Sequence, residues 1–457
     1  MELIPLRQNT VPPIHRVPTE IMVVIFLTCP HLAHRRVMNA RQTPWVFPRV
    51  CRRWRAIALA VPQLWNHMIV DRAQLTIKFT VTKLTQMTQA AIERSGALPL
   101  QIVVALNGAS KHSGDGDFCP LLDLLINQRA RWQYAHIFIP KSHPAYERLT
   151  GITGPLPLLR RLHFETDEEL ANPPYAAFDG APLLTNVTLL AGPLPFASSS
   201  LPLSRLQRLE AQFVSPYEVC KYLLEAQSLK SLKIRSAIYF MPDVSESEPR
   251  PLSLPLLEQF KMTNFDPHVL SHLVIPSLTH LTLVDVSEAW DGCELVTCLM
   301  SCISQSSCQL RYLHINDSDI SPNQLLDVFR ASPSLESFKL EFYRDDCDAM
   351  LGASHSDGGS SGGHLLPNLS TFRLKFCSFA PQSLLDFFEA RYQCTTCVHL
   401  AKARVQTDGD SSPLYEHGTD NYSRLQILIQ DHGLEYRDYI DLGSYDTDES
   451  GWFTDHL

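Results

Sequence analysis

Apolar residues form a repeated pattern over most of the chain. Three apolar residues stand at the first, fourth and sixth positions of each copy, often after a proline. The last two alternate with polar neighbours, as expected for a short strand with one buried side. The nine copies are Leu159/Leu162/Phe164, Leu184/Val187/Leu189, Leu206/Leu209/Ala211, Leu229/Leu232/Ile234, Leu257/Phe260/Met262, Leu278/Leu281/Leu283, Leu310/Leu313/Ile315, Leu335/Phe338/Leu340 and Leu369/Phe372/Leu374. Successive copies are 21 to 34 residues apart, about 26 on average.

The segments between these strands have helical periodicity instead. Apolar residues recur there every three or four positions, which predicts amphipathic helices. The clearest examples are Pro216–Gln227, Leu295–Ser304, Pro322–Ala331 and Pro381–Arg391. A strand and a helix repeated about every 20–29 residues indicate an α/β fold of the leucine-rich-repeat type. We expect a solenoid with a parallel sheet on its concave side and helices on its convex side.

Two further strands are predicted before the regular copies, over Leu100–Leu106 and Trp132–Ile139. The Asn or Cys that usually follows a leucine-rich-repeat strand is mostly absent, and only Cys377 fits that position. The solenoid is therefore expected to have irregular turns. The alternative is an ordinary α/β domain with leucine-rich strands, but nine ordered copies with helices between them favour the solenoid.

The N-terminal segment has a different pattern. Pro18 suits the first position of a helix, and the run Ile21–Leu27 is apolar in every direction. A second helical face extends over Val50–Val61, Pro62 ends it, and the apolar pair Leu64-Trp65 follows. A helix that is apolar on every side must be buried on every side. Because a segment of about fifty residues has little core to offer, part of this surface is predicted to bind a partner.

Residues 14–68 resemble an F-box, the motif that ties a protein to a Skp-type adaptor in a cullin-based ubiquitin ligase. The residues that carry the resemblance are, in order, Pro18-Thr19-Glu20-Ile21, Val50-Cys51-Arg52-Arg53-Trp54 and Leu64-Trp65. The segment departs from the family at Val17, where leucine is usual, and in a long insert from Cys29 to Trp45. With this insert, the segment is similar to the F-box-like proteins of basidiomycete fungi.

The resemblance implies a non-catalytic substrate-recognition subunit of an SCF-type E3 ubiquitin ligase. Its partners would be a Skp-type adaptor, through it a cullin, and a target protein bound by the solenoid. The side chains expected to contact the adaptor or to form the F-box core are Pro18, Ile21, Ile25, Phe26, Val50, Trp54, Leu64 and Trp65. The sequence does not separate contact residues from core residues, and it identifies no substrate-binding residue. The alternative is a leucine-rich-repeat interaction scaffold whose N-terminal helices are only a cap.

These patterns divide the chain into a flexible N-terminus (1–13), an F-box-like domain (14–70), a linking helix (71–97), a solenoid (98–430) and an acidic C-terminal tail (431–457). The linking helix is predicted over Val81–Arg94, and Gly96 suits its end. Composition predicts flexible loops at Pro242–Pro251, Asp345–Gly363 and Arg404–Tyr422.

Composition and charge exclude several classes of function. The net charge of −9 argues against nucleic acid as a partner. No N-terminal signal peptide and no apolar run of about 20 residues is present, so no membrane association is expected. Twelve cysteines without a disulfide framework are typical of reduced thiols. The chain is therefore predicted to be intracellular, in the cytoplasm, the nucleus or both.

The one candidate for metal or redox chemistry is Cys394-x-x-Cys397, with His399 nearby. A structural zinc needs four ligands, and this pair supplies two. The sequence has no phosphate-binding loop and no serine nucleophile elbow. We therefore expect no catalytic residue, no metal and no cofactor. The rival hypothesis is an enzyme that uses these cysteines, and a strongly acidic thiol at Cys394 would favour it.

Overall fold

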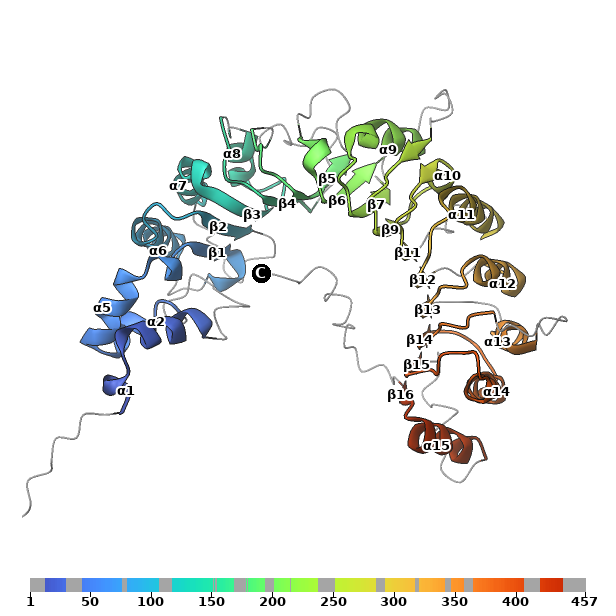
Figure 1. Cartoon of the computed structure of the whole chain (residues 1–457). Helices are drawn as coiled ribbons and strands as arrows, with labels where there is room; N and C mark the ends of the chain where they lie inside the picture. The colour runs from blue at the N-terminus through green and yellow to red at the C-terminus, as the bar shows by residue number, and fades with distance from the viewer. Residues whose placement is uncertain are drawn as a thin grey trace, which may run out of the picture. The chain divides into compact units, whose positions relative to one another are not determined.

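The computed structural model describes most of the chain. The described residues are 13–29, 43–75, 80–106, 117–150, 152, 154–167, 178, 180–193, 201–213, 215–236, 251–284, 292–316, 320–341, 347–356, 365–406 and 420–438. Most of the Cys29–Trp45 insert and of the predicted loop Pro242–Pro251 lies outside these residues. Figure 1 labels the helices and strands.

The main sheet contains fourteen parallel strands in the order β1-β2-β3-β4-β5-β6-β7-β9-β11-β12-β13-β14-β15-β16. Their bounds are β1 His67–Asp71, β2 Leu100–Ala105, β3 Trp132–Phe138, β4 Arg161–Glu165, β5 Asn186–Pro193, β6 Arg208–Phe213, β7 Ser231–Ser236, β9 Gln259–Thr263, β11 His280–Val284, β12 Tyr312–Asn316, β13 Ser337–Glu341, β14 Thr371–Lys375, β15 Lys402–Gln406 and β16 Glu435–Asp438. A second sheet pairs β8 (Leu252–Ser253) with β10 (Leu273–Val274). Parallel strands in chain order, with helices between many of them, confirm the predicted α/β fold and are consistent with a leucine-rich-repeat-like solenoid.

The described helices are distributed along the whole chain. Their bounds are α1 Pro13–Arg16, α2 Thr19–Thr28, α4 Phe47–Val50, α5 Arg52–Ala60, α6 Val81–Arg94, α7 Cys119–Asn127, α8 Glu147–Thr150, α9 Pro216–Tyr222, α10 His268–Ser271, α11 Gly292–Ser306, α12 Pro322–Ala331, α13 Asp348–Ser356, α14 Pro381–Gln393 and α15 Asp420–His432. Contacts divide the chain into a first unit (Met1–Glu168, Pro174–Leu184 and His456–Leu457) and a second unit (Glu169–Pro173 and Thr185–Asp455).

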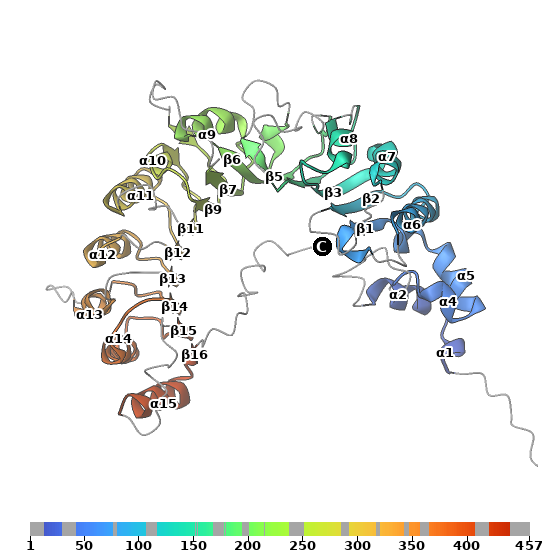
Figure 2. The same ribbon diagram turned by 180° about the vertical axis from the view of Figure 1, so that it is seen from behind.

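In the second unit, the helices from α9 to α15 lie on the outer side of the sheet and the strands on the inner side (Figures 1 and 2). In all nine predicted copies the second and third apolar positions fall on a strand of the main sheet, the first lies two residues before that strand, and all three are buried. These side chains face the helices, so the residues between them point to the opposite face of the sheet. The predicted helices are also present, and α12 has the predicted bounds Pro322–Ala331.

Local interactions explain where these helices begin. At α12, the Ser321 hydroxyl accepts a hydrogen bond from the Gln324 amide nitrogen, and the Gln324 side chain accepts one from the Ser321 amide nitrogen. This capping box satisfies backbone donors that the first turn cannot pair. Pro322 occupies the first turn, where its missing N–H costs nothing.

The irregular turns are held by side chains other than the usual asparagine. Arg391 of α14 is almost fully buried and donates hydrogen bonds to the carbonyl oxygens of Leu366 (2.8 Å), Leu369 (2.9 Å) and Val398 (3.1 Å). The Ser306 hydroxyl accepts a hydrogen bond from the Ile275 amide nitrogen at 2.9 Å. Such bonds satisfy buried backbone groups that no strand or helix pairs.

The second N-terminal helix differs from the prediction. The prediction of one continuous helical face over Val50–Val61 is wrong. Cys51 has an extended backbone (φ −158°, ψ 171°) and separates α4 from α5. The Cys51 sulfur caps α5 by accepting a hydrogen bond from the Trp54 amide nitrogen at 3.4 Å. Val50 consequently ends α4 and is exposed, whereas Ile57 and Val61 are buried. α5 ends before Pro62, as predicted.

The sheet begins earlier than the sequence indicated. β1 pairs in parallel with β2, from His67 with Gln101 to Asp71 with Ala105. The sheet thus starts inside the segment 14–70, and α6 connects its first two strands. The bounds of α6 are those predicted, and Gly96 follows it with a φ of +57° that suits glycine. The division into domains stays a prediction.

Four elements lie wholly or partly where flexible loops or the tail were predicted. α13 occupies part of Asp345–Gly363, and β15 with the start of α15 overlaps Arg404–Tyr422. β16 lies at the start of the predicted tail and pairs with β15, Lys402 with Glu435. The loop predictions are wrong over these residues, and the sheet extends to Asp438.

Candidate functional site

The structure separates the predicted F-box residues into two groups. Phe26, Leu64 and Trp65 are buried, and Trp54 is half-buried. Pro18, Ile21, Ile25 and Val50 are exposed. Pro18 directly precedes α2, which begins at Thr19.

The buried group forms an aromatic core within the first unit. The Phe26 ring stacks on Phe47, with centroids 4.2 Å apart, and meets Trp54 edge-on at 4.9 Å. Trp65 donates a hydrogen bond from Nε1 to the Ala58 carbonyl oxygen at 2.8 Å. Offset and edge-on aromatic pairs add to the gain from burying their area. These contacts hold α2, α4 and α5 together without using the other side of α2.

The exposed group includes one side of α2. Ile21, Val24 and Ile25 are 50%, 54% and 43% exposed. Each residue of a helix turns by about 100°, so these three share a side that differs from the side of Met22 and Phe26. Full burial of the apolar run Ile21–Leu27 is therefore not observed among the described residues. The sequence had missed Val24 as a candidate contact and Met22 and Phe47 as core residues.

A second candidate surface is the face of the sheet in the second unit that points away from the helices. One register position of neighbouring strands carries mostly cationic side chains, and we call it the central row. Its members, from β7 to β15, are Lys233, Lys261, Thr282, His314, Lys339, Arg373 and Arg404. Register pairs place each residue directly beside the next. The sequence prediction identified none of them, although each fills the residue between the two buried positions of its strand.

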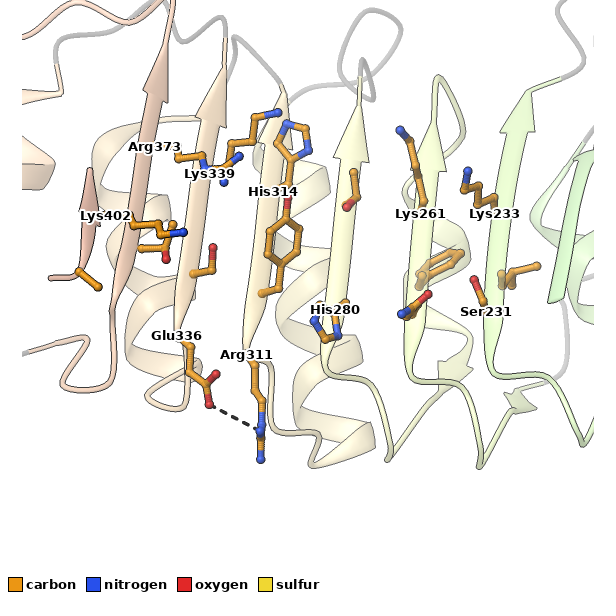
Figure 3. Close-up of a pocket in the computed structure, with 18 residues that line it drawn as sticks. Ser231, Lys233, Lys261, His280, Arg311, His314, Glu336, Lys339, Arg373 and Lys402 are labelled. Carbon is orange, nitrogen blue, oxygen red and sulfur yellow. Dashed lines mark ion pairs between the residues drawn. The ribbon is translucent and has the colours of Figure 1, made fainter. Parts of the chain in front are cut away.

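The central row, except for Arg404, lines a cavity of about 570 Å³ over these strands. Figure 3 shows Lys233, Lys261, His314, Lys339 and Arg373 projecting from neighbouring strands on the same side of the sheet. The Lys and Arg residues that line the cavity are Lys233, Lys261, Arg311, Lys339, Arg373 and Lys402, whereas Glu336 is the one carboxylate among the described residues that line it. His280 and Tyr312 stack within it, with ring centroids 5.7 Å apart. The arrangement is suited to an anionic ligand.

Burial and neighbouring charges shift the pKa values of two residues on this surface, Lys233 and Glu341. Burial lowers the pKa of Lys233 to about 8; Glu210, 3.5 Å from its ammonium nitrogen, opposes this shift, and Lys261 adds to it. Burial alone would raise the pKa of Glu341, but hydrogen bonding with His314 and the charges of Lys339 and Lys375 lower it to about 2. Glu341 is therefore an ionised partner for His314 and Lys339 of the row.

One cluster in the first unit has the donor atoms for a metal ion. His136 of β3 pairs with His163 of β4, and Glu165 lies two residues further on the same face. The ligand atoms of these three residues lie within 4.8 Å of one another. Burial and the nearby His163 lower the pKa of His136 to about 4, which leaves its imidazole neutral. The set could supply three ligands to a divalent cation.

The pKa values of the two cysteines near the C-terminal end of α14 are shifted in opposite directions. A hydrogen bond with the Thr396 hydroxyl, 3.2 Å from the sulfur, lowers the pKa of Cys394 to about 7. Burial raises the pKa of Cys397 to about 11. A lowered pKa increases the thiolate fraction of Cys394 near neutral pH, and the thiolate is the nucleophilic form of cysteine. This is the one observation that favours the enzyme hypothesis.

Comparisons with known proteins assign the chain to no family. No protein-family model matches the chain, and a search of the curated proteins found no match. Within the part of the chain that the structure describes, no helix has the length and apolar character needed to span a membrane. The class that the fold itself defines is an α/β protein with a parallel, leucine-rich-repeat-like sheet.

Proposed function

We propose that the chain is the substrate-recognition subunit of an SCF-type ubiquitin ligase, in which the N-terminal helices bind a Skp-type adaptor. The observation that carries the proposal is the exposed apolar side of α2, formed by Ile21, Val24 and Ile25. The core of these helices is already filled by Phe26, Phe47 and other side chains on the opposite side. An apolar side that the fold does not use is supporting evidence for a protein partner.

The order of the motif residues supports the same proposal. Pro18 and Ile21 at the start of α2, Trp54 in α5 and the closing pair Leu64-Trp65 stand in the order of an F-box. Through the adaptor the chain would join a cullin, and the second unit would hold a target protein. Transfer of ubiquitin would be carried out by other subunits, and this chain would contribute proximity.

The test is binding of a purified Skp-type adaptor to the full chain and to the variant Ile21→Gln/Val24→Gln/Ile25→Gln. Glutamine is a good helix former, and the three side chains are outside the core, so α2 should still fold. Each half-exposed side chain contributes about 1 kcal/mol when it becomes buried, so we expect roughly 100-fold weaker binding.

The matched control changes three exposed apolar residues of the second unit, Leu224→Gln, Leu256→Gln and Ile427→Gln, which are 52%, 48% and 53% exposed. It should bind the adaptor as tightly as the unaltered chain. No association between the adaptor and a soluble, folded full chain would refute the proposal.

The second candidate is an interaction scaffold whose N-terminal helices only cap the sheet. One observation favours it: the Arg94 guanidinium of α6 lies over the rings of Trp45 and Trp65, 5.1 Å and 4.4 Å from their centroids. This cation–π contact ties the N-terminal helices to the helix that follows β1. A scaffold would bind its target with no adaptor, so the same measurement separates the two functions.

A further inference from the structure

The central row carries more positive charge than the fold neutralises. Lys233 pairs with Glu210, and Lys339 pairs with Glu341 at 3.2 Å. Lys261 and Arg373 have no ion-pair partner among the described residues. Opposite charges beside them would stabilise the sheet. Their absence from this register leaves two uncompensated cations on β9 and β14.

Two details show that the charges of these cations are poorly compensated within the described residues. Arg373 Nε is buried and has no hydrogen-bond partner among the described residues. A buried donor that is left unpaired costs free energy, and the Arg373 side chain also lines the cavity, where an anion would offset its charge. Lys261 is close enough to Lys233 to lower its pKa, so two like charges lie side by side in a partly buried position. An anion between them would relieve this repulsion.

The spacing of the two unpaired cations defines the length of the ligand. β9 and β14 are separated by four strand steps in the sheet order β9-β11-β12-β13-β14. Neighbouring strands are about 4.8 Å apart, so Lys261 and Arg373 are about 19 Å apart along the row. An extended peptide advances about 3.3 Å per residue, and about six residues would cover this distance. A small anion such as a single phosphate would reach only one of them.

The middle of the cavity has different chemistry from its ends. Thr282 and His314 continue the row, and the stacked His280 and Tyr312 rings lie two residues before them on the same strands, on the same face of the sheet. Aromatic rings accept apolar and aromatic side chains. The complementary ligand therefore has acidic groups at both ends and an apolar or aromatic residue between them.

We propose that the central row binds an extended acidic peptide segment of a partner protein, with its acidic groups beside Lys261 and Arg373. Under the proposed function this peptide segment belongs to the target protein of the ligase. Its assignment to a ligase target rests on that function. The peptide site itself depends only on residues of the second unit.

A peptide fits the surface better than a nucleic acid. The chain has a net charge of −9, which repels a polyanion at long range. Glu336 and Glu341 also lie beside the row, where they would oppose a polymer with a charge on every unit. A peptide can place its acidic residues at the two unpaired cations and neutral residues elsewhere.

The test uses a fluorescent peptide of about ten residues with a glutamate pair at each end, about six residues apart, and a tyrosine between them. Its affinity for the full chain is compared with that of Lys261→Glu/Arg373→Glu. We expect a loss of about 30-fold or more, because two attractions become repulsions. A glutamine version of the peptide should bind the unaltered chain at least about tenfold more weakly.

The matched control is Lys221→Glu/Arg330→Glu, which makes the same change in net charge on the exposed sides of α9 and α12. It should keep peptide affinity within about twofold, since exposed charges at a distance are screened by salt. If the reversed variant does not fold, Lys261→Gln/Arg373→Gln takes its place. Equal losses in the variant and the control would refute a specific site.

Two further outcomes would overturn the assignment. A single-stranded oligonucleotide that binds as tightly as the peptide, and loses affinity in the same variant, would make nucleic acid the ligand. A gain of about tenfold in peptide affinity when Asp441, Asp446, Asp448 and Glu449 are replaced by their amides would mean that the chain's own C-terminal segment fills the site. Adaptor binding, measured on the same proteins, should be unchanged by Lys261→Glu/Arg373→Glu, so failure of this site and failure of the proposed function are distinguishable.

Discussion

The N-terminal helices and the sheet face of the second unit expose side chains of opposite character. On α2 the exposed side is apolar, formed by Ile21, Val24 and Ile25. On β7 to β15 the face away from the helices is cationic, and Lys261 and Arg373 have no ion-pair partner among the described residues. An apolar side favours a partner through loss of water from both surfaces. A cationic face favours an anionic ligand and responds to salt. Two surfaces this different are suited to two different partners.

The largest effect is expected from substitutions at two neighbouring residues of α2, which test whether this helix has a free apolar side. Phe26 stacks on Phe47 inside the core, whereas Ile25 is exposed. Phe26→Ala should destabilise the N-terminal helices by about 3–5 kcal/mol, the usual cost of removing a buried aromatic ring. Ile25→Ala should change their stability by less than about 0.5 kcal/mol and still weaken adaptor binding.

Hydrogen exchange of the α2 amides measures this difference, because it reports local opening separately from unfolding of the sheet. Binding of the adaptor to both variants is measured in parallel. Equal protection losses in Phe26→Ala and Ile25→Ala would mean that Ile25 belongs to the core and that α2 has no free apolar side.

The sequence predicted the sheet better than it predicted either surface. The nine copies were recognisable because their three buried positions are apolar at fixed spacing, as in Leu369/Phe372/Leu374. β16 was missed because its four residues include one apolar side chain, Tyr436, and the strand forms by pairing with β15. Tertiary pairing of this kind overrides local propensity.

The sequence did not predict the exposed side of α2 or the central row, and the physical reason differs between the two. The run Ile21–Leu27 is apolar all round, so periodicity cannot distinguish Phe26 from Ile25. The central row carried a usable signal, since Lys233, Lys261, Lys339 and Arg373 all stand between the two buried residues of a strand. Aligning the copies by their buried residues would have shown the cationic position. Which of these cations lacks a partner depends on contacts with Glu210 and Glu341, which only the structure provides.

Salt is expected to have an intermediate effect, because it should weaken peptide binding much more than adaptor binding. Raising the salt concentration from about 50 to about 500 mM should weaken binding of the acidic peptide by about tenfold, because the Debye length falls from roughly 14 to 4 Å. Adaptor binding should change by less than about twofold, since it depends on apolar contact. Both affinities are measured by titration of the same full chain. A parallel decline of both with salt would mean that the α2 side binds through charge and would remove the distinction.

The smallest expected effect concerns pH and Lys233. Burial holds the pKa of this residue near 8, with Glu210 opposing the shift and Lys261 and Arg235 adding to it. A lowered pKa means that Lys233 is mostly charged at pH 7 and mostly neutral at pH 9, so its attraction for an anion is lost as pH rises through 8. Peptide affinity should therefore fall by about threefold between pH 7 and pH 9, whereas adaptor binding has no such step. In Lys233→Gln the affinity at pH 7 should already be near the lower value and should vary less over the same range. If the unaltered chain and Lys233→Gln lose affinity equally with pH, another group titrates in the site, and Lys233 makes no contact with the peptide.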